Sequence, residues 1–231
     1  MNKVISLAAI IPAAGVGSRM GLNHPKQYLK IGDQTILEHT LDKLSKVDLI
    51  EHIYIAISDD DAYFDDLELP DNRVTRVSGG KERANSVLNA LKAMKGSPPE
   101  WVLVHDAARP LVCINDIEKL ITTCISADEG GILASKVKDT IKKGDIYSQE
   151  TVPRDQLWQA LTPQLFPYTA LLNALDSALV DGALITDEAS AMERAGQPVR
   201  LISGRSDNIK ITTPEDHALV CFLMDQQQKS I

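Results

Sequence analysis

A short apolar segment, a glycine-containing turn and an amphipathic helix follow one another about four times within the first 135 residues. Buried strands joined by helices pair in parallel, because each right-handed crossover returns the chain to the same edge of the sheet. The succession therefore predicts an α/β fold with a mostly parallel, doubly wound sheet. A length of 231 residues suits one domain that spans residues 1–231.

The individual elements follow from the spacing of apolar residues. Apolar runs predict strands at residues 5–10, 53–57, 73–77, 101–104, 131–135 and 199–202. Helical spacing predicts helices at 34–45, 115–126 and 168–180, and three more that begin near residues 83, 186 and 213. Thr186 is expected to be an N-cap, because its hydroxyl can accept a hydrogen bond from a backbone N–H in the first turn.

Residues 136–153 interrupt this succession. They have alternating polar residues, a Gly144-Asp145 turn and too few apolar residues for a core, which predicts a projecting β-hairpin. An isolated hairpin is only marginally stable in water, so we expect this arm to pack on a partner subunit. A flexible surface loop is the alternative.

Composition excludes several classes of function. The net charge of −8 and the pI near 5.1 argue against nucleic acid or an anionic membrane as the main partner. No apolar run approaches the ~20 residues that span a bilayer, and the N-terminus lacks the pattern of a secretory signal. Three widely spaced cysteines, Cys113, Cys124 and Cys221, are expected to be reduced thiols in a cytoplasmic protein.

The turn after the first strand has the features of a phosphate-binding loop. Ala13, Ala14, Gly15 and Gly17 are small enough for backbone N–H groups to approach a ligand, and the cations of Arg19 and Lys26 follow. The segment lacks the Walker A pattern, and no glycine stands three positions after Gly17, as a dinucleotide fingerprint requires. An ordinary βα turn with scattered surface cations remains the alternative.

Two further turns follow predicted strands. Gly79-Gly80 precedes a helix whose first turn carries Ser86, which predicts either a base or ribose pocket or a plain βα loop. Asp106 follows the strand at 101–104, at the sheet edge where ligands of open α/β sheets bind. Asp106 could therefore be a Mg²⁺ ligand beside a phosphate, or a helix cap or ion-pair partner of Arg109.

Taken in order, these segments resemble the 2-C-methyl-D-erythritol 4-phosphate cytidylyltransferase family, and the first resembles the signature of sugar and alditol nucleotidyltransferases. The matching motifs lie between residues 11 and 216. They are Pro12-Ala-Ala-Gly-x-Gly-x-Arg19-Met20 with Pro25-Lys26-Gln27, Gly79-Gly80-x-Glu82-Arg83-x-x-Ser86-Val87, Val104-His-Asp106-Ala-Ala-Arg109-Pro110, Leu161-Thr162-Pro163-Gln164, Ile185-Thr-Asp-Glu-Ala-Ser190 and Asp207-Asn-Ile-Lys210.

The resemblance implies a Rossmann-like nucleotidyltransferase fold that transfers CMP from CTP to the phosphate of 2-C-methyl-D-erythritol 4-phosphate and releases pyrophosphate. It implies dependence on Mg²⁺, with other divalent cations possible, and a place in the non-mevalonate isoprenoid pathway. It also implies a homodimer in which Arg154 and the arm at 136–153 reach into the neighbouring subunit's site. An already ionised phosphate needs no general base, which is consistent with the absence of a catalytic-looking His or Cys.

The resemblance also assigns roles to individual residues. The catalytic residues it implies are Arg19 and Lys26 on the triphosphate, and Arg154 and Lys210 on the acceptor. Asp106 would lie by the metal. The remaining substrate- and nucleotide-binding residues are Ala13, Ala14, Gly15, Gly79, Gly80, Arg83, Ser86, Ala107, Arg109, Thr162, Thr186 and Asp207.

Two other functions are compatible with these motifs. Ribitol 5-phosphate cytidylyltransferase shares the nucleotide half and much of the acceptor half. A non-catalytic nucleotide-binding regulator could keep the same fold, although the intact Arg19, Lys26, Asp106, Arg154 and Lys210 argue against a decayed site.

Overall fold

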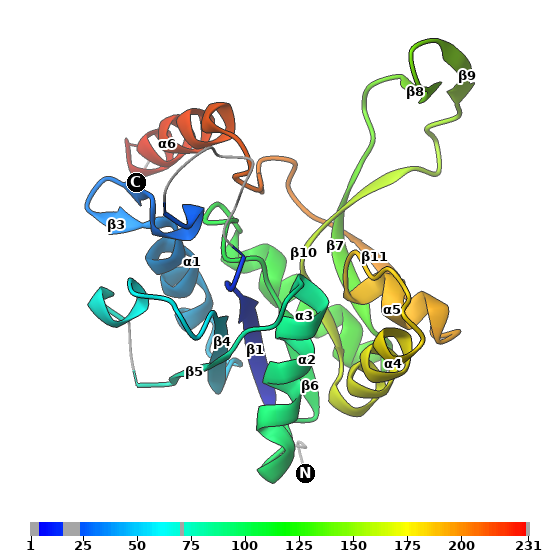
Figure 1. The fold of residues 1–231 in the computed structure, drawn as a ribbon. Coiled ribbons are helices and arrows are strands. Elements are labelled where there is room, and N and C mark those ends of the chain that lie inside the picture. Colours follow the sequence, from blue (N-terminus) through cyan, green and yellow to red (C-terminus); the bar gives the residue numbers. More distant parts are fainter. Residues whose placement is uncertain (1–4, 16–23, 70–71, 230–231) are drawn as a thin grey trace.

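The computed structural model describes residues 5–15, 24–69 and 72–229, and its centre is a seven-stranded sheet (Figure 1). The strand order across the sheet is β11-β7-β10-β6-β1-β4-β5. The strands are β1 (Leu7–Pro12), β4 (His52–Ile57), β5 (Val74–Ser78), β6 (Trp101–Val104), β7 (Gly131–Lys136), β10 (Trp158–Pro167) and β11 (Arg200–Ser203).

The sheet is mostly parallel, which confirms the predicted fold class. β1 pairs in parallel with both β4 and β6, β4 pairs in parallel with β5, and β7 pairs in parallel with β11. Only β10, among the strands of this sheet, runs antiparallel to its neighbours β6 and β7.

The apolar pattern of the sequence did not predict β10. Pro163 lies in the middle of this segment, and a proline normally argues against a central strand because it cannot donate to the ladder. In the structure the pairing with β7 shifts register between Ala160 and Gln164, so the proline falls within an irregularity that does not need its donor.

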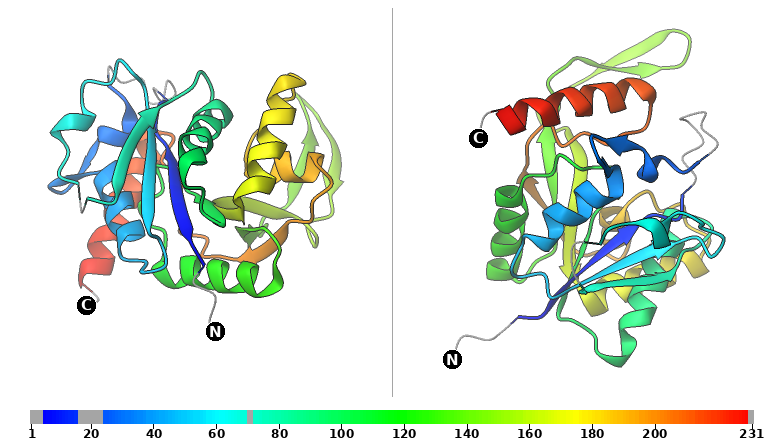
Figure 2. Two further views of the ribbon diagram at one scale, coloured as in Figure 1. Left: turned by 90° about the horizontal axis from the view of Figure 1, so that it is seen from below. Right: turned by 90° about the vertical axis from the view of Figure 1, so that its left-hand side faces the viewer.

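Helices cover both faces of the sheet (Figure 2). They are α1 (Ile36–Ser45), α2 (Arg83–Ala93), α3 (Ile114–Ala127), α4 (Tyr168–Val180) and α5 (Glu188–Arg194), while α6 (Pro214–Lys229) packs in a separate cluster with Ile31 and Ile211. Side chains alternate across a strand, so Leu7, Ala9 and Ile11 of β1 pack in the core under α1 and α3. Ala8 and Ile10 pack in the opposite core under α2, α4 and α5. None of the described helices is both long and apolar enough to cross a membrane.

The helix N-termini show which capping predictions hold. Thr35 caps α1 and exchanges hydrogen bonds with Glu38, so α1 begins two residues later than predicted. The predicted N-cap at Thr186 is wrong. Asp187 caps α5 instead, because its carboxylate accepts a hydrogen bond from the backbone N–H of Ser190 at 3.0 Å.

The segment at 136–153 forms a hairpin that projects from the body of the molecule (Figure 1). Its strands are β8 (Ile141–Gly144) and β9 (Ser148–Val152), while Lys136 completes β7. Ile146 and Tyr147 at its tip are 85% and 83% exposed. A second small sheet, β2 (Lys30–Ile31) with β3 (Gln34–Thr35), follows the short 3₁₀ helix η2 (Lys26–Tyr28).

Candidate active site

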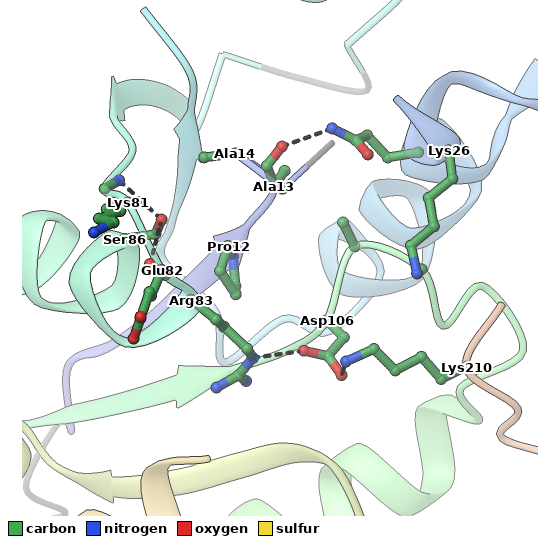
Figure 3. Close-up of a pocket in the computed structure, with 15 residues that line it drawn as sticks. Pro12, Ala13, Ala14, Lys26, Lys81, Glu82, Arg83, Ser86, Asp106 and Lys210 are labelled. Carbon is green, nitrogen blue, oxygen red and sulfur yellow. Dashed lines mark hydrogen bonds and ion pairs between the residues drawn. The ribbon is translucent and has the colours of Figure 1, made fainter. Parts of the chain in front are cut away.

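A cavity of about 320 Å³ opens at the carboxyl ends of β1 and β6, where ligands of open α/β sheets bind (Figure 3). Its walls come from the segment after β1, the N-terminus of α2, the segment after β6, η2 and Lys210. The residues that line it are Pro12, Ala13, Ala14, Gly15, Lys26, Gln27, Gly80, Lys81, Glu82, Arg83, Ser86, Asp106, Ala107, Ala108 and Lys210.

One wall consists of two tightly packed turns. A Cβ atom at Gly79 would lie 2.3 Å from the Cβ of Ala14, so only glycine allows these turns to approach so closely. Ser86 closes the second turn, because its hydroxyl accepts a hydrogen bond from Gly80 N at 3.0 Å and donates to Glu82 O at 3.2 Å. The first turn is fixed by Gln27, whose Nε2 donates to Ala13 O at 2.7 Å.

Asp106 lies at the floor of the cavity within a group of cations. Its Oδ1 is 2.9 Å from Arg83 Nε, and its Oδ2 is 2.9 Å from Lys210 Nζ. Arg109 Nε lies 3.4 Å from Oδ2. In Figure 3, Arg83 and Lys210 approach the carboxylate from opposite sides. Burial alone would raise the pKa of Asp106, but the three cations lower the pKa far below its ordinary value.

The ion-pair network continues from Asp106 to a buried glutamate on another helix. Arg83 Nη1 and Nη2 donate to Glu188 Oε1 and Oε2 at 2.7 and 3.0 Å. Three cations and two carboxylates leave one positive charge in excess. Lys26 adds another positive charge on the side of Lys210, where its Nζ donates to Ile211 O at 2.6 Å. The cavity therefore favours an anionic ligand.

A second set of hydrogen bonds supports Asp106 from below. Asp106 N donates to Thr162 Oγ1 at 3.1 Å, and this hydroxyl lies 3.0 Å from His105 Nδ1. His105 Nε2 lies 3.2 Å from Arg109 O. The burial of His105 lowers its pKa to about 4, so the ring is neutral at pH 7. The ring and the hydroxyl fix the turn that carries Asp106 and Arg109.

Comparison with known proteins identifies the family. Residues 7–226 match the model of the family described as 2-C-methyl-D-erythritol 4-phosphate cytidylyltransferase. This chain belongs to that family. The chain is 65% identical over 228 residues to the cytidylyltransferase of this name from Pseudoalteromonas translucida, covering 99% of this chain and 95% of the relative. The cytidylyltransferase of the same name from Vibrio cholerae is 52% identical over 228 residues, with 97% and 98% covered.

Solved structures agree with this assignment. A crystal structure of a 4-diphosphocytidyl-2C-methyl-D-erythritol synthase superposes with a TM-score of 0.83 at 37% identity, covering 95% of this chain and 98% of that one. The 2-C-methyl-D-erythritol 4-phosphate cytidylyltransferase of Francisella tularensis superposes with a TM-score of 0.82 at 36% identity, covering 94% and 99%.

The structure of this cytidylyltransferase family member brings most of the predicted site residues together. Those that line the cavity are Ala13, Ala14, Gly15, Lys26, Gly80, Arg83, Ser86, Asp106, Ala107 and Lys210. Gly79 and Arg109 lie directly behind it, against Ala14 and Asp106. Arg19 lies outside the described residues.

Four predicted residues lie away from the cavity of their own chain. Thr162 is buried beneath Asp106, and Thr186 is exposed just before α5. Asp207 forms an ion pair with Arg205, and Arg154, which directly follows the arm, donates to Lys138 O at 2.6 Å.

Sequence reasoning gave no role to several residues that the fold places at the site. Gln27, Lys81 and Glu82 line the cavity, and Glu188 is only 1% exposed beside Arg83. Gln27, Glu82 and Glu188 stand within the family-like motifs. The motifs therefore marked these positions but did not show where their side chains lie.

The carboxylates of this site do not form a metal centre by themselves. Within residues 5–15, 24–69 and 72–229, no group of three or more His, Cys, Asp and Glu side chains could hold a metal ion. Asp106 is a buried carboxylate at the cavity, and Glu82 is an exposed one at its rim.

Proposed function

We propose that this chain transfers CMP from CTP to 2-C-methyl-D-erythritol 4-phosphate, giving 4-diphosphocytidyl-2-C-methyl-D-erythritol and pyrophosphate. The observation that supports this most is a cavity in which a turn of small residues faces Lys26, Arg83 and Lys210 around Asp106. Membership of the cytidylyltransferase family supplies the substrates.

The geometry suits the binding of a nucleoside triphosphate. Lys26 would contact the phosphates, and backbone N–H groups at the N-terminus of α2 add positive potential. The close contact of Gly79 with Ala14 makes the cavity narrow at its other wall. A narrow cavity favours a pyrimidine base over the larger purine base.

The reaction requires charge stabilisation more than covalent catalysis. An oxygen of the acceptor phosphate forms a bond to the α-phosphorus of CTP while the bond to the bridging oxygen breaks, and that oxygen leaves as pyrophosphate. A phosphate monoester is already mostly ionised at pH 7, so no base has to remove a proton. Lys26 and Lys210 would stabilise the negative charge that develops during transfer.

We propose Mg²⁺ or another divalent cation as cofactor, held by Asp106. Mg²⁺ in nucleotide sites uses one or two carboxylates plus substrate phosphates, and Asp106 supplies one buried carboxylate. Both oxygens of Asp106 already accept from Arg83, Lys210 and Arg109, so a cation that arrives with the triphosphate would share Asp106 with these side chains or displace one of them. The bound cation would neutralise charge on the triphosphate.

We also propose a homodimer formed through the arm at 136–153, with Arg154 serving the partner's site. Arg154 is exposed and does not line its own cavity, and Ile146 and Tyr147 at the arm's tip are the kind of apolar side chains a partner covers. Cytoplasmic localisation is proposed because Cys113, Cys124 and Cys221 are free thiols.

Pyrophosphate release with CTP and Mg²⁺ tests the proposal, using methylerythritol phosphate and ribitol 5-phosphate as parallel acceptors. Turnover with methylerythritol phosphate alone is the expected result. Preference for ribitol phosphate would move the chain to the alternative acceptor. Binding of CTP without turnover of either acceptor would favour a regulatory protein.

A further inference from the structure

Glu188 is a buried carboxylate that the proposed reaction does not use directly. It is 1% exposed and lies at the first position of α5, outside the residues that line the cavity. A buried carboxylate is costly unless it is paired, and both oxygens of Glu188 are paired with the same guanidinium.

Glu188 determines where Arg83 can lie. The two Nη atoms of Arg83 donate to Glu188, while its Nε donates to Asp106 Oδ1 at 2.9 Å. A guanidinium is planar and rigid, so fixing both Nη atoms also fixes the direction of Nε–H. The carboxylate of Glu188 thus orients the donor that holds Asp106.

The contacts that hold Glu188 form a closed ring through four segments distant in sequence. On β10, Gln164 Nε2 donates to Asp187 Oδ2 and Gln164 Oε1 accepts from Ala189 N, both at 2.9 Å. These two bonds fix the N-terminus of α5 on either side of Glu188. Gln164 also pairs in the sheet with Val104, two residues before Asp106. From there, Asp106 leads through Arg83 back to Glu188.

We propose that Glu188 is a positioning residue for the transfer reaction, acting through Arg83 to hold Asp106 in its orientation at the cavity floor. The inference rests on the function proposed above. In this proposal the Glu188–Arg83 pair also connects the nucleotide-binding turn to α5, which begins two residues after Thr186. A change at Glu188 should therefore alter catalysis without a direct contact to either substrate.

The test is a double-mutant cycle with Glu188→Gln and Arg83→Gln, measured as kcat and KM for each substrate. Glu188→Gln keeps the shape but places an amide group against Arg83, and kcat is expected to fall ~10- to 100-fold, as is typical for supporting residues of a site. Since Glu188 acts through Arg83, the same change in the Arg83→Gln background should cost little more. Glu188→Asp, which keeps the charge, should recover part of the activity.

Controls separate positioning from folding. Glu193→Gln makes the same change at an exposed position of α5 and should retain wild-type kinetics. Leu175→Ala, on the buried face of α4, lowers stability away from the cavity, and its kcat should stay near wild type below its Tm. The double variant Glu188→Gln/Arg83→Gln removes both charges of the buried pair and leaves neither unpaired. It should therefore remain folded even where Glu188→Gln alone does not.

Three results would overturn the inference. One is wild-type kinetics in folded Glu188→Gln. Another is a loss of kcat that persists undiminished in the Arg83→Gln background. The third is a loss of activity that follows Tm alone and is matched by Leu175→Ala. If wild type itself gave no pyrophosphate with CTP and either acceptor, the proposed function would fail, and this inference would fail with it.

Discussion

At the scale of single residues, the site depends on charges that burial makes strong. Asp106 is 6% exposed, so its bonds to Arg83 and Lys210 act in a medium that screens less than water does. Exposed pairs such as Lys229 with Asp225 contribute little by comparison.

Lys26→Ala is expected to lower kcat by ~10²-fold or more, because it removes a fixed cation from the wall of the cavity. Pyrophosphate release at saturating CTP measures the loss, and circular dichroism checks the fold. Lys229→Ala is the matched control on the surface. If kcat of folded Lys26→Ala stayed at the wild-type value, Lys26 would not act on the triphosphate.

His105 is expected to make stability depend on pH. Its pKa in the fold is about 4, below the value of 6.5 for an exposed histidine, so the unfolded chain takes up the proton first. Its contribution is complete above pH 6.5 and declines as the pH falls toward 4. At pH 5 the loss amounts to about 2 kcal/mol of unfolding free energy.

Urea unfolding at pH 7, 6 and 5 measures this effect. His105→Gln should show a smaller decline than wild type, whereas His52→Gln at the surface should show the same decline as wild type. Equal slopes for wild type and His105→Gln would show that the ring does not titrate as stated.

At the scale of elements, two βα turns shape the cavity by packing against each other. Gly79 N donates to Ile57 O at 2.7 Å, which holds the second turn against the end of β4. Ala13 N donates to Ala56 O at 2.8 Å, which holds the first turn against the same strand. Both turns are therefore held by the end of β4.

Gly79→Ala is expected to destabilise the fold by about 1–3 kcal/mol and to weaken CTP binding, because the added methyl would overlap Ala14. Thermal unfolding and calorimetric titration with CTP measure the two effects. Gly96→Ala is the matched control, since no atom lies within 4 Å of its added Cβ. Equal CTP affinity of both variants would mean that the turns are not part of the nucleotide pocket.

At the scale of the whole molecule, the arm has no role in the core or the cavity of its own chain. It projects from the sheet (Figure 1), and Arg154 at its base does not line the cavity of its own chain. A site shared between protomers would explain both facts.

Mixing two variants, each impaired at a different residue of the proposed shared site, tests such sharing. Arg154→Ala alone should chiefly weaken use of the acceptor phosphate, and Lys26→Ala should be inactive. Equal amounts of the two, dissociated and reassembled, should regain about a quarter of wild-type activity, because half of the dimers are mixed and each has one intact site. No recovery, with mixed dimers verified by mass, would place Arg154 in its own chain's site or in none.

Much of the fold could be predicted from local pattern. The strand at 101–104 and the helix at 168–180 lie where the apolar residues placed them, because the strand is one continuous buried run and the helix is buried at helical spacing. β10 and the cap at Asp187 were not predictable, because pairing across the sheet and the contact with Gln164 decide them.

The sequence by itself determined the order of the motifs and the residue types they carry, which sufficed to indicate a phosphate-binding α/β enzyme and its family. Only the tertiary structure decided that Glu188 faces Arg83, that Thr162 lies beneath Asp106, and that Arg154 does not line its own cavity. The physical reason is how far apart in sequence the interacting residues are. Turns and helices arise from neighbouring residues, whereas an ion pair between positions 105 residues apart exists only after the sheet has brought them together.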